Sequence, residues 1–357
     1  MYPHGIPPPG CNGDVHARLL AAAKEGNLAA LEETIQCPNV DYETEDNDGK
    51  TSLGIASSQG HLEVVRVLVN KAYSDVNAAN KKTFGRTPLN IAAMNGHLGV
   101  VKELLKAPAV RVNTGDLWER TPLHTALWYR QPQVLKALLK SPNITVNSVD
   151  NKRRTPLLWA SWLGHIEVVQ ALLDAPNINV NAADKSGTTP LHWASHAGHP
   201  KVVQALLNAS NIAVNAVEKD GDTSLHHASF KGYLKIVQTL LNVPNINVNP
   251  ADEYGRTPLY WAATNGHYNV VKALLKTANI DVNASTKQGA TPLYSSCLNG
   301  HFEVVQEILL CPKADMTAVC NGKTALEVAR REQWMDIEEM MEARNELLKI
   351  GNNSCPN

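Results

Sequence analysis

The stretch TPLHWASHAGHPKVVQALL, from Thr189 to Leu207, decides the fold of this chain. Thr189 can cap a helix with its hydroxyl, and Pro190 suits the first helical position because its missing N–H costs nothing there. Gly198 ends this short helix, since glycine tolerates a left-handed backbone. A second helix follows, whose apolar residues share one face: Val202, Val203, Leu206 and Leu207. The stretch therefore predicts two short helices joined by a tight turn.

The same pattern recurs along the whole chain at a nearly fixed distance. The tetrad T-P-L-x begins at Thr87, Thr121, Thr155, Thr189, Thr257 and Thr291, with T-S-L variants at Thr51 and Thr223 and T-A-L at Thr324. Successive distances are 36, 34, 34, 34, 34, 34, 34 and 33 residues, and a degenerate repeat starts near Ala17. A fixed period of this length is typical of a solenoid. We therefore predict ten repeats in one array, although 357 residues could make two or three ordinary domains.

The motifs of each repeat point to a known family. A 34-residue period also fits the tetratricopeptide repeat, but the W-x2-L-G-x2-Y signature is absent. The recurring T-P-L-H-x-A, followed by G-H and V-V-x-x-L-L, resembles the ankyrin repeat over about nine-tenths of the chain. The resemblance implies an all-α fold, an ankyrin-type helical solenoid with short β-hairpin or turn fingers. We expect a flexible tail at 1–13, the array at 14–343 with capping repeats near 14–47 and 320–343, and the end of the capping helix and a tail at 344–357.

Three features of the pattern predict details of this architecture. The leucines that stand two residues after a tetrad threonine should form one continuous buried row, called here the leucine ladder: Leu89, Leu123, Leu157, Leu191, Leu225, Leu259 and Leu293. The spacing of 36 before Thr87 should appear as a longer hairpin, because two residues inserted in a helix would rotate its apolar face by about 200°. The P-N-I junctions, as at Asn177 and Asn245, should end the second helices, since asparagine tolerates a left-handed backbone.

Composition excludes several classes of protein. A net charge of −1 excludes a uniformly basic surface, and no apolar run is long enough to span a bilayer. The start MYPHGIPPPG lacks the basic and apolar regions of a secretory signal. The cysteines are scattered without a C-x-x-C pair, which indicates free thiols: Cys11, Cys37, Cys297, Cys311, Cys320 and Cys355. We expect a cytoplasmic protein, with the nucleus as the alternative, and no membrane insertion.

Candidate chemistry is explained by the repeat. Nine of the 13 histidines occupy repeat positions and should bond neighbouring backbone: His124, His192 and His226 in T-P-L-H, and His61, His97, His165, His199, His267 and His301 in G-H. The two G-K-T triplets lack the first glycine of a phosphate loop, since Thr44 and Thr317 stand there. No nucleophile–base pair falls outside the repeat positions. We therefore expect no enzyme, no cofactor and no metal site.

Binding is predicted from the positions that vary between repeats. In ankyrin-type proteins the partner contacts the hairpin tips and the exposed side of the first helix, on the concave face. Counted from each tetrad threonine, these are positions −4, −3, −1, +4, +7 and +8. In repeats 3 to 8 they carry aromatic and basic residues, the types that dominate interface hot spots. The predicted partner-binding residues are Phe84, Arg86, Trp118, Arg120, Trp128, Tyr129, Lys152, Arg154, Trp159, Trp162, Trp193, His196, Phe230, Tyr254 and Trp261.

Some of these residues have a purely structural alternative. Trp159, Trp193 and Trp261 lie at position +4, where tryptophan is equally compatible with packing. Near the cluster, Lys81, Lys82, Arg86, Arg120, Lys152, Arg153 and Arg154 outnumber Asp116 and Glu119, which favours an acidic or phosphorylated partner segment. We predict a non-catalytic scaffold or adaptor that binds a protein or peptide segment. The alternative is a nucleotide or oligonucleotide sensor that stacks bases on Trp and Tyr and contacts phosphates through Arg and Lys.

Overall fold

The computed structural model describes residues 14–70, 74–80, 82 and 84–353. The expected tail at 1–13 lies outside these ranges, as do Lys81 and Thr83. The described residues fall into two compact units, each considered by itself below. The N-terminal unit lies within 1–160 and 167–184, and the C-terminal unit within 161–166 and 185–357.

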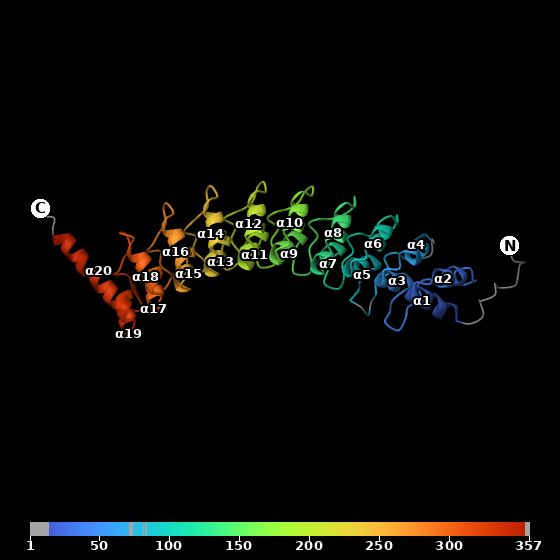
Figure 1. Cartoon of the computed structure of the whole chain (residues 1–357), viewed down its shortest axis with the longest axis horizontal. Helices are drawn as coiled ribbons and strands as arrows, with labels where there is room; N and C mark the ends of the chain where they lie inside the picture. The colour runs from blue at the N-terminus through green and yellow to red at the C-terminus, as the bar shows by residue number, and fades with distance from the viewer. Residues whose placement is uncertain (1–13, 71–73, 81, 83, 354–357) are drawn as a thin grey trace, which may run out of the picture. The chain divides into compact units, whose positions relative to one another are not determined.

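The N-terminal unit is built from helix pairs that follow one another along the chain. Its helices are α1 (Val15–Glu25), α2 (Leu28–Thr34), α3 (Ser52–Gln59), α4 (Leu62–Asn70), α5 (Pro88–Asn95), α6 (Leu98–Leu104), α7 (Pro122–Trp128) and α8 (Pro132–Leu139), followed by most of α9 (Pro156–Leu163) and α10 (Ile166–Leu173). The first helices α1, α3, α5 and α7 contact one another in order, and the second helices α2, α4, α6 and α8 do the same (Figure 1). The unit therefore has two helical layers.

The C-terminal unit repeats this arrangement. Its helices are α11 (Pro190–Ala197), α12 (Pro200–Leu207), α13 (Ser224–Phe230), α14 (Leu234–Leu241), α15 (Pro258–Thr264), α16 (Tyr268–Leu275), α17 (Pro292–Leu298), α18 (Phe302–Leu309), α19 (Ala325–Arg331) and α20 (Met335–Asn353). Odd-numbered helices form one layer and even-numbered helices the other. The described residues hold only two strands, β1 (Val319–Cys320) and β2 (Lys323–Thr324), which pair antiparallel. The predicted all-α architecture with ten helix pairs is confirmed.

The tetrad threonines begin the first helices, as their sequence predicts. The Thr87 hydroxyl accepts a hydrogen bond from the Asn90 N–H at 3.3 Å. In the repeats whose fourth tetrad residue is a histidine, that side chain adds a second hydrogen bond, to the threonine N–H. Thus His192 Nδ1 accepts the Thr189 N–H at 3.2 Å, while its Nε2 lies 3.2 Å from the Asp222 carbonyl oxygen of the next hairpin. Each such histidine caps its own helix and also ties its repeat to the following one.

The G-H histidines connect successive repeats through the backbone. His97 Nε2 bonds the Ser58 carbonyl oxygen at 3.0 Å, and its ring lies against Gly60 of the preceding repeat. His199, His267 and His301 make the same kind of bond. Where the motif is lost, Gln131 substitutes by donating to the Met94 carbonyl at 3.3 Å. The predicted backbone role of these histidines is confirmed at each of the bonds named here.

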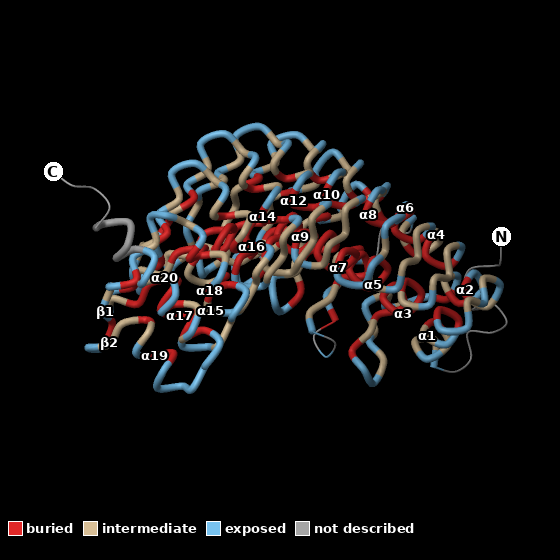
Figure 2. The backbone as a smooth tube through the Cα atoms, turned by 60° about the vertical axis from the view of Figure 1, so that its left-hand side comes forward, coloured by how far each residue is buried: buried red, intermediate tan, exposed pale blue. Residues whose placement is uncertain are grey.

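The buried core follows the predicted leucine ladder. Leu89, Leu123, Leu157, Leu191, Leu225, Leu259 and Leu293 are all at most 2% exposed. Figure 2 shows buried residues along the helices and exposed ones along the connecting turns. Burying one leucine side chain contributes roughly 2 kcal/mol, so each repeat is stabilised mainly by this face and its neighbours.

The insertion and the P-N-I junctions are also where the sequence predicts them. The Asp46 N–H bonds the Lys50 carbonyl across one hairpin, whereas Asn80 N–H bonds the Arg86 carbonyl across the next. The second hairpin is therefore two residues longer and leaves both flanking helices intact. Asn177 and Asn245 have φ of 60° and 63°, so the left-handed junction is confirmed.

Two expectations differ from the structure. The closing helix α20 continues to Asn353, so it takes up most of the segment 344–357 in which we expected the end of the helix and a tail. Cys37 is disulfide-bonded, so the prediction of free thiols is wrong for this residue, while Cys297, Cys311 and Cys320 are free. The sequence carried no paired spacing that could have revealed this bond.

Candidate functional site

Three hairpin tips are organised by a buried aspartate. In the N-terminal unit the Asp150 side chain is 0% exposed, and its Oδ2 lies 2.7 Å from Arg154 Nη2 and 2.8 Å from Arg154 Nε. Its Oδ1 accepts the backbone N–H groups of Lys152 and Arg154 at 2.9 Å. Burial acts to raise the pKa of Asp150, but the hydrogen bonds from Arg154 outweigh it and lower that pKa below its usual value.

The same arrangement recurs at other hairpins. Asp116 lies 2.7 Å from Arg120 in the N-terminal unit, and Asp252 lies 2.6 Å from Arg256 in the C-terminal unit. Both carboxylates are 0% exposed. These arginines hold the hairpins together, so their charge is already compensated within the protein. The sequence-based comparison of charges left out Asp150, and it counted Arg120 and Arg154 as free although both are paired. The spacing D-x-x-x-R, present in all three hairpins, was the available signal.

The paired arginines also cover aromatic rings. The guanidinium carbon of Arg120 lies 4.3 Å from the centroid of the Trp118 ring. The guanidinium carbon of Arg154 lies 4.0 Å from the centroid of the Trp159 ring. Arg256 lies 4.4 Å from Tyr254 and 4.3 Å from Trp261. An arginine stacked on an aromatic face is stabilising and restricts both side chains. The hairpin aromatics are therefore held in defined orientations.

In the N-terminal unit these contacts leave an exposed aromatic surface. Phe84 and Trp118 are 48% and 37% exposed, and their rings lie 4.8 Å apart. Their hairpins are joined by a hydrogen bond from the Leu117 N–H to the Phe84 carbonyl. Trp128 and Tyr129, at the end of α7, are each 41% exposed. The sequence predicted all four of these residues as contacts.

Trp159 follows the packing alternative that its position +4 left open. Its side chain is only 7% exposed, and its indole N–H donates to Asp150 at 3.2 Å. Trp128 packs edge-on against it at 4.8 Å. Arg154 stacks on the Trp159 ring, and Trp128 packs against the same ring. Trp159 is therefore a packed residue that supports the exposed Trp128.

The C-terminal unit carries a second set of aromatics. Trp162, Phe230 and Tyr254 are 37%, 37% and 49% exposed. Trp162 lies 5.8 Å from Trp193, and Phe230 lies 5.0 Å from Trp261. Trp193, Trp261 and His196 are half-buried, so each supports a neighbour while keeping an accessible part. We call the hairpin tips and the solvent-facing side of the first helices of each unit its finger face.

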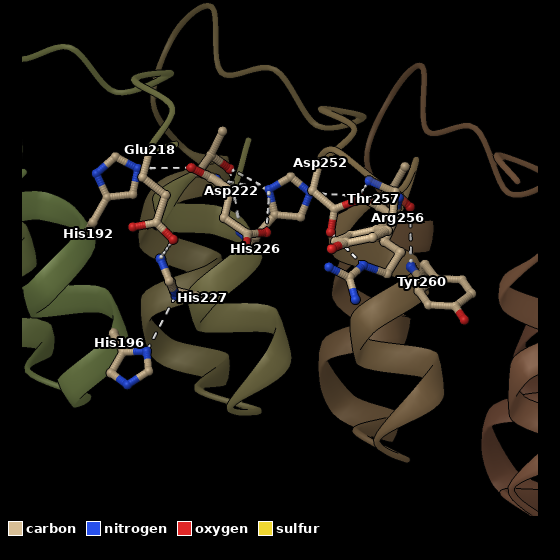
Figure 3. Close-up of polar contacts among 12 residues, drawn as sticks. His192, His196, Glu218, Asp222, His226, His227, Asp252, Arg256, Thr257 and Tyr260 are labelled. Carbon is tan, nitrogen blue, oxygen red and sulfur yellow. Dashed lines mark hydrogen bonds and ion pairs between the residues drawn. The ribbon is translucent and has the colours of Figure 1, made fainter. Parts of the chain in front are cut away.

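A histidine and carboxylate cluster adjoins this second set (Figure 3). His227 Nε2 lies 3.2 Å from a Glu218 carboxylate oxygen, and its Nδ1 lies 3.3 Å from His196 Nδ1. Burial raises the pKa of Asp222 to about 6 and lowers that of His192 to about 4. Sequence reasoning missed Glu218 and Asp222. Their signal is that Asp222 stands where other hairpins carry the arginine.

Neither metal ligation nor membrane insertion has support in the described part of the chain. Within it no group of three or more His, Cys, Asp or Glu side chains is placed to hold a metal ion. No helix there is both long and apolar enough to cross a bilayer. The histidines of Figure 3 bond one another, backbone oxygens and carboxylates instead.

Tandem helix pairs, hairpin fingers and an exposed aromatic face define a solenoid repeat protein of the kind that presents a binding surface. Family models for ankyrin repeats match residues 19–116, 73–150, 108–184, 141–218, 176–252 and 210–286, and a further one matches 269–306. The chain therefore belongs to the ankyrin-repeat family, whose repeats are generally non-catalytic protein–protein interaction modules. A comparison with curated proteins finds no match.

Proposed function

We propose that this protein is a non-catalytic scaffold or adaptor that binds segments of another protein on the finger faces of its two units, the faces predicted to be concave. The observation that carries the proposal is the exposure of large aromatic side chains there. Seven of them are between 37% and 49% exposed: Phe84, Trp118, Trp128, Tyr129, Trp162, Phe230 and Tyr254. Rigidly held aromatics of this kind provide most of the binding energy at protein interfaces.

The charges on these faces restrict where an acidic group of the partner would bind. Arg120, Arg154 and Arg256 are paired with buried aspartates, so they contribute little attraction to an acidic ligand. Lys152 and Arg153 are exposed, and neither takes part in an ion pair among the described residues. An acidic or phosphorylated group of the partner would therefore lie near these two residues and not along the whole face.

The pairing of these arginines with aspartates favours a protein segment over a nucleotide or oligonucleotide as the ligand. A phosphate ligand needs cations whose charge is not already compensated. Of the arginines and lysines near the aromatic cluster, Arg86, Arg120 and Arg154 all lie within 3.8 Å of a buried aspartate. Lys152 and Arg153 stay exposed, so the cations without an aspartate partner there are concentrated at one hairpin. The cytoplasmic or nuclear location and the capping role of the repeats near 14–47 and 320–343 stay predictions.

A competition experiment tests the choice between the two ligand classes. The chain is used to capture partners from a cell extract with and without a nucleotide mixture or short oligonucleotides, each from micromolar to millimolar concentration. Its melting temperature is measured over the same range of additive. We expect protein capture that nucleic acid does not displace, and no change in melting temperature. A melting temperature raised by micromolar nucleotide would show that the sensor function is correct instead.

A further inference from the structure

A polar pocket lies in the C-terminal unit between the hairpins of repeats 6 and 7. Its volume is about 340 Å³, and its lining includes Thr188, Trp193, His196, Glu218, Asp220 and His227. It therefore combines an indole face with two carboxylates, and only Lys219 adds a positive side chain. Burial lowers the pKa of His196, so this ring adds no positive charge at neutral pH.

The other repeats of this chain show what such a site holds. In repeats 5 and 8 the residue before the tetrad is an arginine, and its guanidinium covers the tryptophan at position +4: Arg154 lies 4.0 Å from Trp159, and Arg256 lies 4.3 Å from Trp261. Each guanidinium also meets a carboxylate, at 2.7 Å and 2.6 Å. A tryptophan face with a carboxylate beside it is thus a guanidinium site in this protein.

Repeat 6 keeps the tryptophan but lacks the arginine. Thr188 stands before its tetrad, and Trp193 follows at position +4. The carboxylate is provided by the next hairpin, where Glu218 accepts a hydrogen bond from the Thr188 hydroxyl at 2.8 Å. An arginine also approaches the carboxylate of the following hairpin elsewhere, since Arg86 Nε lies 3.8 Å from Asp116. The pocket thus occupies the place of a missing guanidinium.

We propose that this pocket binds the side chain of an arginine from the partner segment. The guanidinium would stack on the Trp193 indole, as Arg154 does on Trp159, and donate to Glu218 of the next hairpin, as Arg86 approaches Asp116. Arginine suits the site better than lysine, because only a planar guanidinium can stack on the ring and donate to the carboxylate at once. The proposal rests on the proposed function and adds one specific residue type to the partner.

The direct test uses the full chain and a defined probe. The tripeptide acetyl-Gly-Arg-Gly-amide is titrated into 15N-labelled protein, and the seven tryptophan indole signals are followed by NMR. A Trp193→Phe variant assigns the Trp193 signal. We expect that signal to shift saturably, with a Kd on the order of millimolar because one side chain buries little area. The citrulline tripeptide, of equal shape but neutral, should bind at least tenfold more weakly, and the lysine tripeptide should also bind more weakly.

Two variants and one control sharpen the result. Thr188→Arg should place the protein's own guanidinium in the pocket and abolish binding of the peptide, with the melting temperature retained because four other hairpins carry arginine there. Glu218→Gln should weaken binding at least tenfold. Glu303→Gln, at an exposed carboxylate on α18 that does not line the pocket, should change it less than threefold. Equal binding of the citrulline and arginine peptides, or undiminished binding to Thr188→Arg, would overturn the proposal.

The outcome is distinguishable from that of the proposed function. If a captured partner binds wild type and Thr188→Arg equally but loses affinity when exposed aromatics are replaced, the arginine pocket is wrong and the scaffold function stands. If the arginine tripeptide binds as expected but the finger face captures no protein, the pocket stands and the scaffold function is wrong.

Discussion

Replacing Asp150 with alanine should lower the free energy of unfolding by about 3 kcal/mol, because one buried carboxylate satisfies several groups at once. Arg154, two backbone N–H groups and the Trp159 indole N–H all donate to it. Alanine would leave these donors without their acceptor, and each unpaired buried donor costs about 1 kcal/mol or more. Urea unfolding followed by circular dichroism measures this difference.

Matched variants separate the ion pair from the shape of the side chain. Asp150→Asn keeps the shape and an acceptor oxygen but removes the charge, so it should cost about half as much. Glu119→Ala, at an exposed acid of a neighbouring hairpin, should change stability by less than about 0.5 kcal/mol. An effect of Asp150→Ala no larger than that of Glu119→Ala would show that the hairpin does not depend on this carboxylate.

Acidification from pH 7 to pH 5 should destabilise the protein by several kcal/mol. Burial is the main cause that lowers the pKa of His124, His192 and His226 to about 4, whereas a histidine in the unfolded chain titrates near 6.5. The unfolded chain therefore binds protons first as the pH falls. Each histidine contributes stability that is present above pH 6.5 and lost as the pH falls towards 4, about 2 kcal/mol by pH 5.

The geometry explains why these histidines must stay neutral. His226 Nδ1 accepts the Thr223 N–H at 3.0 Å, and its Nε2 lies 3.0 Å from the Arg256 carbonyl oxygen. A protonated ring has no lone pair left for the threonine. Asp222 acts in the opposite direction, since burial raises its pKa to about 6, and it offsets about 1 kcal/mol at pH 5.

Urea unfolding at pH 5, 6 and 7 tests this sign. His192→Gln, which keeps an acceptor and a donor but does not titrate, should flatten the pH dependence while costing stability at pH 7. Stability that rises between pH 7 and pH 5 would contradict the account.

The fold was predictable from short sequence patterns because the same patterns recur in successive repeats. The threonine caps, glycine and asparagine junctions and leucine positions act within a few residues, so the register needed no knowledge of distant contacts. The two-residue insertion before Thr87 was placed correctly for the same reason, since neither helix could absorb it.

The site was harder to predict, because exposure depends on which neighbours cover a ring. Trp128 and Trp159 both occupy variable positions, yet only Trp128 is exposed, since Arg154 covers Trp159 and Trp128 packs on it. Asp150 was overlooked because a count of charges along the sequence does not show which charges are paired. Its partner, Arg154, follows four residues later in the same hairpin. The Cys37 disulfide had no local pattern at all.

The affinity of a captured partner for single aromatic variants tests the central claim most directly. Trp128→Ala, Tyr129→Ala and Trp162→Ala should each weaken binding by about 2 kcal/mol, or roughly 30-fold, measured by isothermal titration calorimetry. Phe302→Ala is the matched control, since Phe302 is 36% exposed on a second helix, outside the finger face, and should leave affinity unchanged. Melting temperatures of all four variants should stay close to wild type. Unchanged affinity in the three finger-face variants, or loss of stability with affinity retained, would contradict the account.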